Sequence, residues 1–353
     1  MSPESEIVTN YINNKADYTP LFLTGESLNV LKMIPDASVD CCMTSPPYWQ
    51  KRQYDEGGIG LETSFEEYIE NLVSISAEIF RILKPTGSFW LNIGDSYKNK
   101  QLLNIPWRVA IRLTENGWIH RNTVIWNKVK GGPDNAKDKL RNIYEPVFHF
   151  VKSRKYYYDI DSARNKPQSA TVEKGKVVSS TGVTGVSYRR KIELSTALTA
   201  EQKSAALRAL DDVLQEVADG KIYDFRMIIN GVTRATHSDS EKLSGRAKEL
   251  KEKGFYFIKC NPKGSKPSDI WDIIPEDTQG RKSHFAPYPE DLCRTPIMLT
   301  CPQGGIVLGP FSGTGTTSIV AYKMGRKSIG IDISKHYNEI AASRFEEIRG
   351  SLL

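Results

Sequence analysis

The stretch GGIVLGPFSGTGTTSIVAYKMGRKSIGID (304–332) decides the fold of this chain, because it joins two strands through a glycine loop and a helix. The pattern predicts an apolar strand at 304–309, a helix at 316–324 and a second strand at 328–332. Similar strands and helices alternate along the rest of the chain. The expected fold is therefore α/β, with a doubly wound, mostly parallel sheet.

The glycine loop, residues 310–317, has the properties of a ligand site. Gly313 and Gly315 let backbone N–H groups and the N-terminus of the following helix approach a ligand closely. An acidic residue at the end of the next strand, here Asp332, is where a ribose diol is commonly held. A tight turn that needs glycines only for packing has the same pattern, so the motif alone leaves both interpretations open.

Two features separate this loop from common nucleotide-binding loops. It lacks the lysine of a phosphate-binding GxxxxGK[ST] sequence. A dehydrogenase would place its glycine loop early in the chain, but only 36 residues follow Thr317 here. The other strands of the sheet must come from the N-terminal part, so we expect a circularly permuted sheet.

The second motif is TSPPYW (44–49), which directly follows the apolar stretch VDCCM. Its two prolines predict a rigid turn at the carboxyl end of a buried strand, where active sites of open α/β sheets lie. The Pro46 carbonyl could accept a hydrogen bond from a substrate amine, Ser45 adds a second acceptor, and Tyr48 offers a flat face to a planar ring. Pro-Pro-aromatic sequences also occur in ordinary loops, so the motif gains weight only together with the permuted glycine loop.

Helix and strand signals continue through the rest of the chain. Ser64 is a predicted N-cap with Glu67 three residues later, and Thr199 begins a predicted capping box. The further predicted helices lie at 64–83, 105–116, 199–220, 239–253 and 289–300, and the further strands at 39–44, 88–94, 119–127 and 144–152. Residues 166–191, rich in Ser, Thr, Gly and Lys, are predicted to form a loop.

The charge of the chain is unevenly distributed. Its 353 residues include 48 Lys+Arg and 42 Asp+Glu, a net charge of +6. Residues 151–268 contain 23 basic and 14 acidic residues, a net of +9, which leaves −3 for the remainder. The basic excess therefore lies in one central segment, which favours a polyanionic partner. An ordinary solvated insertion would have a similar composition.

The composition excludes several classes of protein. There is no long apolar run for a membrane-spanning helix, and residues 1–15 lack the apolar core of a secretory signal. Five cysteines in so long a chain do not form a disulfide framework, and no Cys/His cluster indicates a metal site. We expect a cytoplasmic protein that does not contact a membrane.

The two motifs, in this order, resemble those of the DNA methyltransferases that modify exocyclic amines, in their β arrangement. In that family a [DNS]PP[YFW] motif precedes an FxGxG motif, as TSPPYW precedes FSGTG here. The resemblance extends over nearly the whole chain. Further blocks that carry it are TGES (24–27), IGLE…YI…L (59–72), LKPTGSFWLNIGDSY (83–97), WNKVKGGPDNAKDKLRNIYEPVFHFVK (126–152) and HFAPYPE (284–290).

The resemblance implies a Rossmann-like methyltransferase fold with S-adenosylmethionine as the cofactor and no metal. The cofactor-binding residues that it implies are Glu26, Pro310, Phe311, Gly313, Gly315, Thr316, Thr317 and Asp332, with Glu26 near the adenine. The catalytic residues that it implies are Ser45, Pro46, Pro47 and Tyr48.

The resemblance also implies a division of the chain. The catalytic α/β domain would comprise residues 1–152 and 269–353, and residues 153–268 would be the target-recognition region. Candidate contacts to bases or phosphates are Arg154, Arg189, Arg190, Arg226, Arg234 and Arg246, although a surface arginine is often only solvated. The expected partner of a monomer or homodimer is double-stranded DNA, and a cognate restriction endonuclease is a further candidate.

The chemistry implied is direct transfer to an exocyclic amine. Carbon-5 methylation of cytosine needs a thiolate, typically in a Pro-Cys dipeptide, and none occurs here. Acceptors at Ser45 and Pro46 would direct the amine lone pair at the sulfonium methyl of a flipped base stacked on Tyr48. Ser45 in the first motif position favours N4 of cytosine within the resembled family, with N6 of adenine as the alternative.

One residue departs from the family pattern. Gly309 stands where the family usually has aspartate, in DPFxGxGTT. This glycine could weaken cofactor binding, mark an inactive copy or be a functional substitution. The alternatives are therefore a DNA-binding relative that has lost catalysis, and a methyltransferase acting on RNA or protein. The basic insertion favours nucleic acid over protein, and the resemblance favours DNA over RNA.

Overall fold

The structure, a computed structural model, divides the chain into two compact units. It describes residues 3–51, 57–131, 134–165, 171–173, 176–178, 185–232, 245–275 and 288–352. The larger unit comprises residues 1–163 and 268–353, and the smaller unit comprises residues 164–267. Residues 153–163, which we expected in the central insertion, thus belong to the larger unit.

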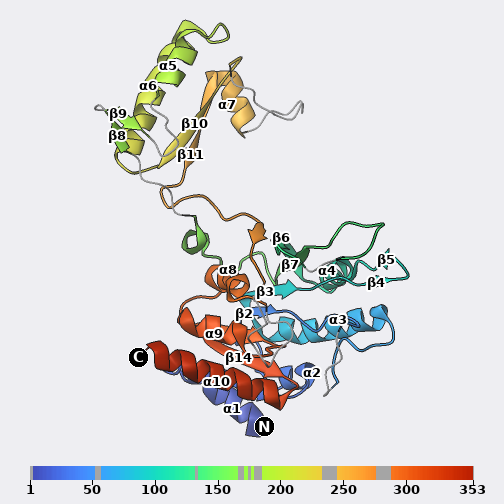
Figure 1. Cartoon of the computed structure of the whole chain (residues 1–353). Helices are drawn as coiled ribbons and strands as arrows, with labels where there is room; N and C mark the ends of the chain where they lie inside the picture. Colours follow the sequence, from blue (N-terminus) through green and yellow to red (C-terminus); the bar gives the residue numbers. More distant parts are fainter. Residues whose placement is uncertain are drawn as a thin grey trace. The chain divides into compact units, whose positions relative to one another are not determined.

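An eight-stranded sheet forms the centre of the larger unit (Figure 1). Its spatial order is β1-β14-β13-β2-β3-β7-β6-β12. The strands are β1 (Leu21–Thr24), β2 (Val39–Thr44), β3 (Leu83–Asn92), β6 (Ile119–Asn127), β7 (Tyr144–Val151), β12 (Ile270–Asp272), β13 (Ile306–Gly309) and β14 (Lys327–Asp332). Only β7 runs antiparallel to its neighbours, β3 and β6, while the other pairs in this sheet are parallel. The sheet is therefore mostly parallel, as predicted.

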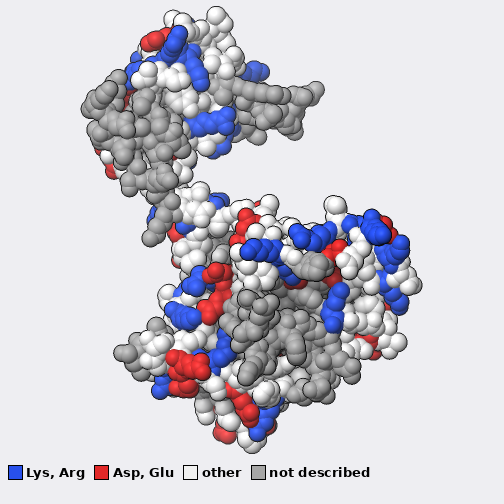
Figure 2. Space-filling model, in the orientation of Figure 1, with Lys and Arg blue, Asp and Glu red and all other residues white. Residues whose placement is uncertain are grey.

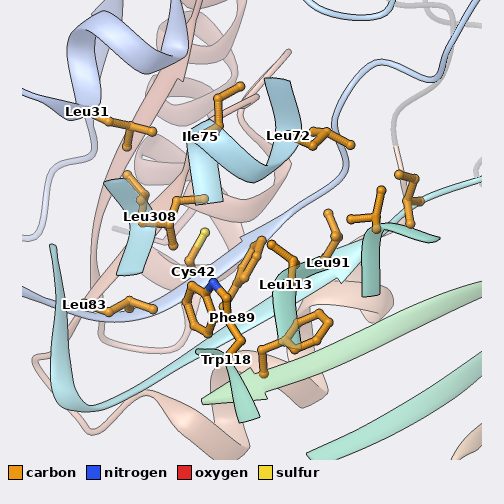
Figure 3. Close-up of a cluster of buried hydrophobic side chains, with 14 of the residues drawn as sticks. Leu31, Cys42, Leu72, Ile75, Leu83, Phe89, Leu91, Leu113, Trp118 and Leu308 are labelled. Atoms are coloured by element: carbon orange, nitrogen blue, oxygen red, sulfur yellow. The ribbon is translucent and has the colours of Figure 1, made fainter. Parts of the chain in front are cut away.

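Helices cover both faces of this sheet, and the alternation along β2 shows why. All six residues of β2 are buried, and successive side chains point to opposite faces. Cys41 and Met43 belong to the apolar cluster formed with α8 and α9, whereas Cys42 lies in the cluster formed with α2, α3 and α4 (Figure 3). The helices are α1 (Pro3–Asn13), α2 (Ser27–Leu31), α3 (Phe65–Ile82), α4 (Ile105–Glu115), α8 (Glu290–Thr300), α9 (Thr316–Lys323) and α10 (Lys335–Leu352).

The predicted helix caps are present. Ser64 precedes α3 and accepts a hydrogen bond from the Glu67 N–H at 3.1 Å. A short hairpin, β4 (Tyr97–Lys98) and β5 (Gln101–Leu102), follows β3, and a 3-10 turn lies at Ile160–Ala163. None of the described helices has the length and apolar character needed to cross a bilayer.

The smaller unit is built on two antiparallel strands, β10 (Asp224–Ile229) and β11 (Phe255–Cys260). One face packs against α5 (Val186–Glu193) and α6 (Ala200–Ala218), and the other packs against α7 (Gly245–Lys253). Thr199 and Gln202 form the predicted capping box at the start of α6.

One prediction for this region was wrong, and two strands were missed. Residues 166–191 were expected to form a loop, but they include β8 (Thr171–Glu173), β9 (Lys176–Val178) and the start of α5. The strands β10 and β11 were not predicted, although Phe225, Met227 and Ile229 alternate with residues on the opposite face. The predicted helix at 239–253 is described from Gly245 onward as α7, and its first residues lie outside the described chain.

Candidate active site

The two sequence motifs meet at the carboxyl ends of neighbouring strands. β13 and β2 pair in parallel, with Val307 opposite Cys41 and Leu308 opposite Cys42. The TSPPY loop (44–48) therefore begins beside the start of the glycine loop. A direct contact joins them, because the Thr317 hydroxyl donates to the Met43 carbonyl at 3.5 Å across 274 residues of sequence. One edge of the sheet thus holds both motifs.

A hydrogen bond from a neighbouring helix fixes the TSPPY loop, while one backbone carbonyl of the loop stays available to a ligand. The Tyr68 hydroxyl, on α3, donates to the Pro47 carbonyl at 2.8 Å. Pro46 is buried, and Ser45, Pro47 and Tyr48 are half-buried. Within the part of the chain that the structure describes, no group donates a hydrogen bond to the Pro46 carbonyl. This carbonyl can therefore accept a hydrogen bond from a ligand.

The hydroxyl of Tyr48 is fixed by residues that our sequence analysis did not single out. It lies 2.7 Å from Glu145 Oε2 and 3.2 Å from Asn92 Oδ1, and the Ser45 hydroxyl donates to it at 3.2 Å. Lys128 Nζ in turn donates to Glu145 Oε1 at 2.5 Å. Burial, followed by the nearby Glu145 charge, raises the pKa of Tyr48 well above its ordinary value. Tyr48 therefore stays protonated and can donate to Glu145.

The sequence carried a signal for these partners. Asn92 is the last residue of β3, and Glu145 is the second residue of β7. Because β7 is antiparallel to β3, its beginning lies at the same edge as the end of β3. Polar residues at the predicted strand ends were therefore candidates, once the reversed direction of β7 was known.

A glycine supports the ring of Tyr48. A Cβ atom placed on Gly94 would lie 2.4 Å from Tyr48 Cε2 and 2.7 Å from Cδ2. These distances are far below van der Waals contact, so only glycine lets the ring occupy its position. Gly94 thus sets the orientation of Tyr48 through the shape of the backbone.

The glycine loop needs glycine at Gly315, and the Asp332 carboxylate fixes the conformation of the loop. Gly315 has φ of +79° and begins α9, and a Cβ atom there would lie 2.8 Å from the Ala341 Cβ, so it is needed for conformation and packing. The Gly313 N–H donates to Asp332 Oδ2 at 2.8 Å, and the Ser334 N–H donates to Asp332 Oδ1 at 2.9 Å. Asp332 therefore shapes the loop through both of its carboxylate oxygens.

The other predicted cofactor residues lie at the same edge. β1 pairs with β14 so that Thr24 is opposite Asp332, which places Glu26 just beyond the end of β1. Glu26 is exposed and caps α2, accepting hydrogen bonds from the Leu28 and Asn29 N–H groups at 3.3 Å each. The Ser27 hydroxyl donates to the Pro310 carbonyl, which links this turn to the glycine loop.

Gly309 is not required by the backbone. A Cβ atom there would meet Thr317 Cβ at 3.7 Å and Ser312 Cβ at 3.8 Å, which is ordinary contact, and its φ is not positive. The structure therefore has room for the beginning of a larger side chain at this position.

The thiols are not placed for nucleophilic catalysis. Cys41 and Cys42 are buried in β2, and burial raises the pKa of Cys41 to about 12. Cys301 is also buried, and burial raises the pKa of its thiol well above the ordinary range. A reactive thiolate is therefore not available at these positions. Within the described ranges, no group of three or more His, Cys, Asp or Glu side chains could hold a metal ion.

The predicted DNA-contacting arginines are separated by the structure. Arg154 lies in the larger unit. Arg189 is on α5 and pairs with Asp211, while the neighbouring Arg190 is exposed. Arg226 is exposed on β10, on the face of the smaller unit that packs against α7, and Arg246, on α7, lies over the Tyr256 ring at 5.7 Å. Arg234 lies outside the described residues.

Comparison with known proteins places this architecture in a family. The model of the N6/N4 methyltransferase family, described as DNA methylase, matches residues 39–343 and so includes both motifs. The chain belongs to this DNA methylase family. It is 30% identical to the type II methyltransferase M.SfiI of Streptomyces fimbriatus, over 89% of this chain and 88% of that protein. It is 25% identical to M.SmaI of Serratia marcescens, over 91% of this chain and 89% of that protein.

Solved structures share the fold of this methyltransferase. PvuII DNA methyltransferase (cytosine-N4-specific) matches with a TM-score of 0.55 and 18% identity, over 92% of this chain and 84% of that one. A putative DNA modification methylase from Thermus thermophilus, complexed with S-adenosyl-L-methionine, matches with a TM-score of 0.50 and 20% identity, over 93% of both chains.

The protein is thus a DNA methyltransferase, and its cofactor is S-adenosylmethionine. The site residues fit this cofactor. The glycine loop offers backbone N–H groups and a helix N-terminus, Asp332 offers acceptors for ribose hydroxyls, and Phe311 is a half-buried aromatic residue beside them. Thr44 Oγ1, at the end of β2, is buried and has no hydrogen-bond partner in the described residues, which leaves one further polar atom for a ligand.

Proposed function

We propose that this protein is a site-specific methyltransferase that methylates the exocyclic N4 amine of cytosine in duplex DNA. The observation that carries the proposal is the adjacency of the TSPPY and glycine loops at the ends of β2 and β13, joined by the contact between Thr317 and Met43. This adjacency puts the proposed amine acceptors beside the residues that we assign to the cofactor. Ser45, Pro46, Pro47 and Tyr48 are the proposed catalytic residues.

The proposed roles follow from the chemistry of an amine. The nitrogen lone pair of an exocyclic amine is delocalised into the ring, so the enzyme must draw it out of conjugation. The Pro46 carbonyl, which accepts no hydrogen bond within the described residues, and the Ser45 hydroxyl would each accept one amine proton. The lone pair would then point away from both acceptors, toward the methyl donor. The new carbon–nitrogen bond would form in line as the sulfonium–methyl bond breaks, and the surplus amine proton would pass to solvent water.

S-adenosylmethionine, when bound, supplies the methyl group as an electrophilic sulfonium substituent. Pro310, Phe311, Gly313, Gly315, Thr316 and Thr317 would surround it, with Asp332 at the ribose and Glu26 near the adenine. The target cytosine must leave the duplex to reach this edge, and stacking on the Tyr48 ring would offset part of the lost base stacking.

The choice of base rests on Ser45, because the resemblance associates serine at the first motif position with cytosine-N4 enzymes. Adenine-N6 methylation is the alternative, since the shape of the pocket decides which base fits. A DNA-binding relative with weakened catalysis is a second alternative, motivated by Gly309. The buried cysteines argue against carbon-5 methylation, which needs a thiolate.

We infer a circularly permuted catalytic domain, in which the strand before the glycine loop is near the C-terminal end of the sequence but central in the sheet. Residues 153–268 would recognise the target, and Arg190 and Arg226 are the better candidates for DNA contact because they are exposed and pair with no described acid. A cognate restriction endonuclease would act on the same site.

The test is to sequence and digest DNA from a methylation-free host that expresses the chain. We expect N4-methylcytosine by mass spectrometry, at one short sequence. N6-methyladenine alone would make the base choice wrong. DNA without any methylated base would favour the weakened relative.

A further inference from the structure

A strongly basic segment lies in the larger unit, before the central insertion in the sequence and distinct from it. Residues 97–144 contain 10 Lys+Arg and 3 Asp+Glu, a net of +7. The larger unit as a whole has 28 basic and 30 acidic residues, a net of −2. The rest of that unit therefore carries −9, so the positive charge is local to this segment.

The structure gathers part of this charge into one surface. The β4–β5 hairpin contacts the connection between β6 and β7: Lys100 Nζ lies 2.7 Å from Asp138, and Lys139 Nζ lies over the Tyr97 ring at 5.3 Å. Figure 2 shows Lys and Arg side chains gathered over the part of the unit where Figure 1 draws β4 and β5. We call this the hairpin surface, and its cations are Lys98, Lys100, Lys130, Lys137, Lys139 and Arg141.

Most of these cations have no acidic partner. Lys98, Lys130, Lys137 and Arg141 are exposed. None of the four forms an ion pair with any residue that the structure describes, whereas Lys100 pairs with Asp138 and Lys139 with Asp134. Clustered like charges repel one another, and a polyanion would relieve that repulsion while releasing its own counterions.

The hairpin surface adjoins the catalytic loop. Lys98 Nζ lies over the ring of Trp49, the residue after Tyr48, at 5.9 Å. Lys128, where the β6–β7 connection leaves the sheet, bonds Glu145, which holds the Tyr48 hydroxyl. A polyanion bound to this surface would therefore pass beside the site where the target amine reacts.

Exposed apolar side chains lie among the same cations. Leu140 is 90% exposed between Lys139 and Arg141, and Tyr144 is 52% exposed. Apolar side chains between cations suit a nucleic acid, which presents sugar and base surfaces between its phosphates. An acidic protein would match the positive charges but not the alternation of apolar side chains with cations.

We propose that the hairpin surface binds the phosphate backbone of duplex DNA next to the target base, so that the catalytic unit contributes its own sequence-independent affinity. This inference rests on the proposed function for the choice of DNA as the polyanion. Because the contacts are to phosphates, replacing these cations with neutral residues should weaken binding to any duplex sequence by about the same factor.

The test compares two pairs of substitutions in the full-length protein. Lys130→Gln/Lys137→Gln removes two cations of the hairpin surface, and Lys15→Gln/Lys32→Gln removes two exposed cations of the same unit near α1 and α2. The probe is a fluorescein-labelled random-sequence duplex of about 30 base pairs, titrated at about 50 to 200 mM NaCl. For the first pair we expect the Kd to be about tenfold higher than that of the wild type. The slope of log Kd plotted against log[NaCl] should be shallower by about two.

The control pair should leave both quantities unchanged. An unchanged slope in Lys130→Gln/Lys137→Gln, or equal changes in both pairs, would overturn the inference. So would an effect of the first pair on an RNA duplex but not on DNA. If the first pair loses thermal stability, Lys98→Gln/Arg141→Gln replaces it. Mass spectrometry of DNA treated with the wild-type protein tests the proposed function separately, because the binding measurement does not depend on methyl transfer.

Discussion

The hydroxyl of Tyr48 lies 2.7 Å from Oε2 of Glu145, although the two residues are 97 positions apart in the sequence. This contact connects the TSPPY loop to a strand, β7, that runs antiparallel to its neighbours in the sheet. Glu145 is largely buried, with 13% of its side chain exposed, and is neutralised by Lys128. The ring of Tyr48 is thus held at its hydroxyl by Glu145 and at its face by Gly94.

The Tyr48–Glu145 contact should matter for the rate of transfer and not for cofactor binding. Tyr48→Phe keeps the ring but removes the donor, and we expect kcat to fall about tenfold to a hundredfold because the ring is less well positioned. The Kd for S-adenosylmethionine should stay unchanged. Glu145→Gln should have a similar effect, and the double variant should be no worse than either single one. Additive losses in single-turnover assays would contradict this coupling.

Replacing Gly94 tests the other support of the ring. Gly94→Ala places a Cβ atom 2.4 Å from Tyr48 Cε2, so the ring must move and kcat should fall by about a hundredfold. Gly350→Ala is the matched control, because nothing lies within 4 Å of a Cβ atom there. Wild-type turnover by Gly94→Ala, with an unchanged melting temperature, would show that the ring position is unimportant.

Gly309→Asp should tighten the binding of S-adenosylmethionine. The position accommodates a Cβ atom at ordinary contact distances, and a carboxylate there would restore the residue that is usual in the family pattern. Gly309→Ala adds only the Cβ atom, without the carboxylate, and should leave affinity unchanged. Isothermal titration calorimetry of both variants measures the affinity for S-adenosylmethionine. Equal affinities of Gly309→Asp and the wild type would contradict the prediction.

Asp332→Asn should weaken cofactor binding. The carboxylate accepts hydrogen bonds from the Gly313 and Ser334 N–H groups through different oxygens, and an amide has only one acceptor oxygen. The glycine loop should therefore lose its geometry together with one ribose contact. A charged hydrogen bond contributes about 1.5 to 3 kcal/mol, so we expect the Kd to rise about tenfold to a hundredfold by calorimetry. Glu66→Gln, on the exposed first turn of α3, is the control and should bind normally.

His149 should make the stability of the protein depend on pH. It is 2% exposed on β7, stacks on Trp90 with ring centroids 4.1 Å apart, and lies 3.1 Å from the Ser88 hydroxyl. Burial lowers the pKa of His149 to about 3, below its unfolded value of about 6.5. Protonation therefore favours the unfolded chain, and stability present above about pH 6.5 is lost as the pH falls toward 3.

The loss should approach about 1.4 kcal/mol per pH unit below pH 6.5. Urea unfolding at pH 6.5 and pH 5 should therefore show a drop about 2 kcal/mol larger in the wild type than in His149→Phe, which keeps an aromatic ring against Trp90. Identical pH dependence in the two proteins would mean that His149 is solvated when folded.

Local patterns in the sequence were enough to predict the helices and strands around both motifs. The short buried run of β2, the Ser64 cap of α3 and the positions of Gly313 and Gly315 depend on residues within a few positions of each other. The order of the motifs also indicated that β13 belongs with strands from the N-terminal part of the chain. These features are properties of the backbone and of short-range side-chain contacts, so they can be predicted from sequence alone.

The partners of Tyr48 and the hairpin surface depend on the tertiary structure. Glu145 reaches Tyr48 only because β7 runs antiparallel to β3, and a strand direction is decided by long-range pairing that no local pattern encodes. The same holds for the charge. The sequence contains a basic excess of +9 in residues 151–268 and of +7 in residues 97–144, but only the tertiary structure brings the β4–β5 hairpin into contact with the β6–β7 connection. The sequence by itself determined which chemistry this methyltransferase carries, and tertiary packing decided which distant side chains position it.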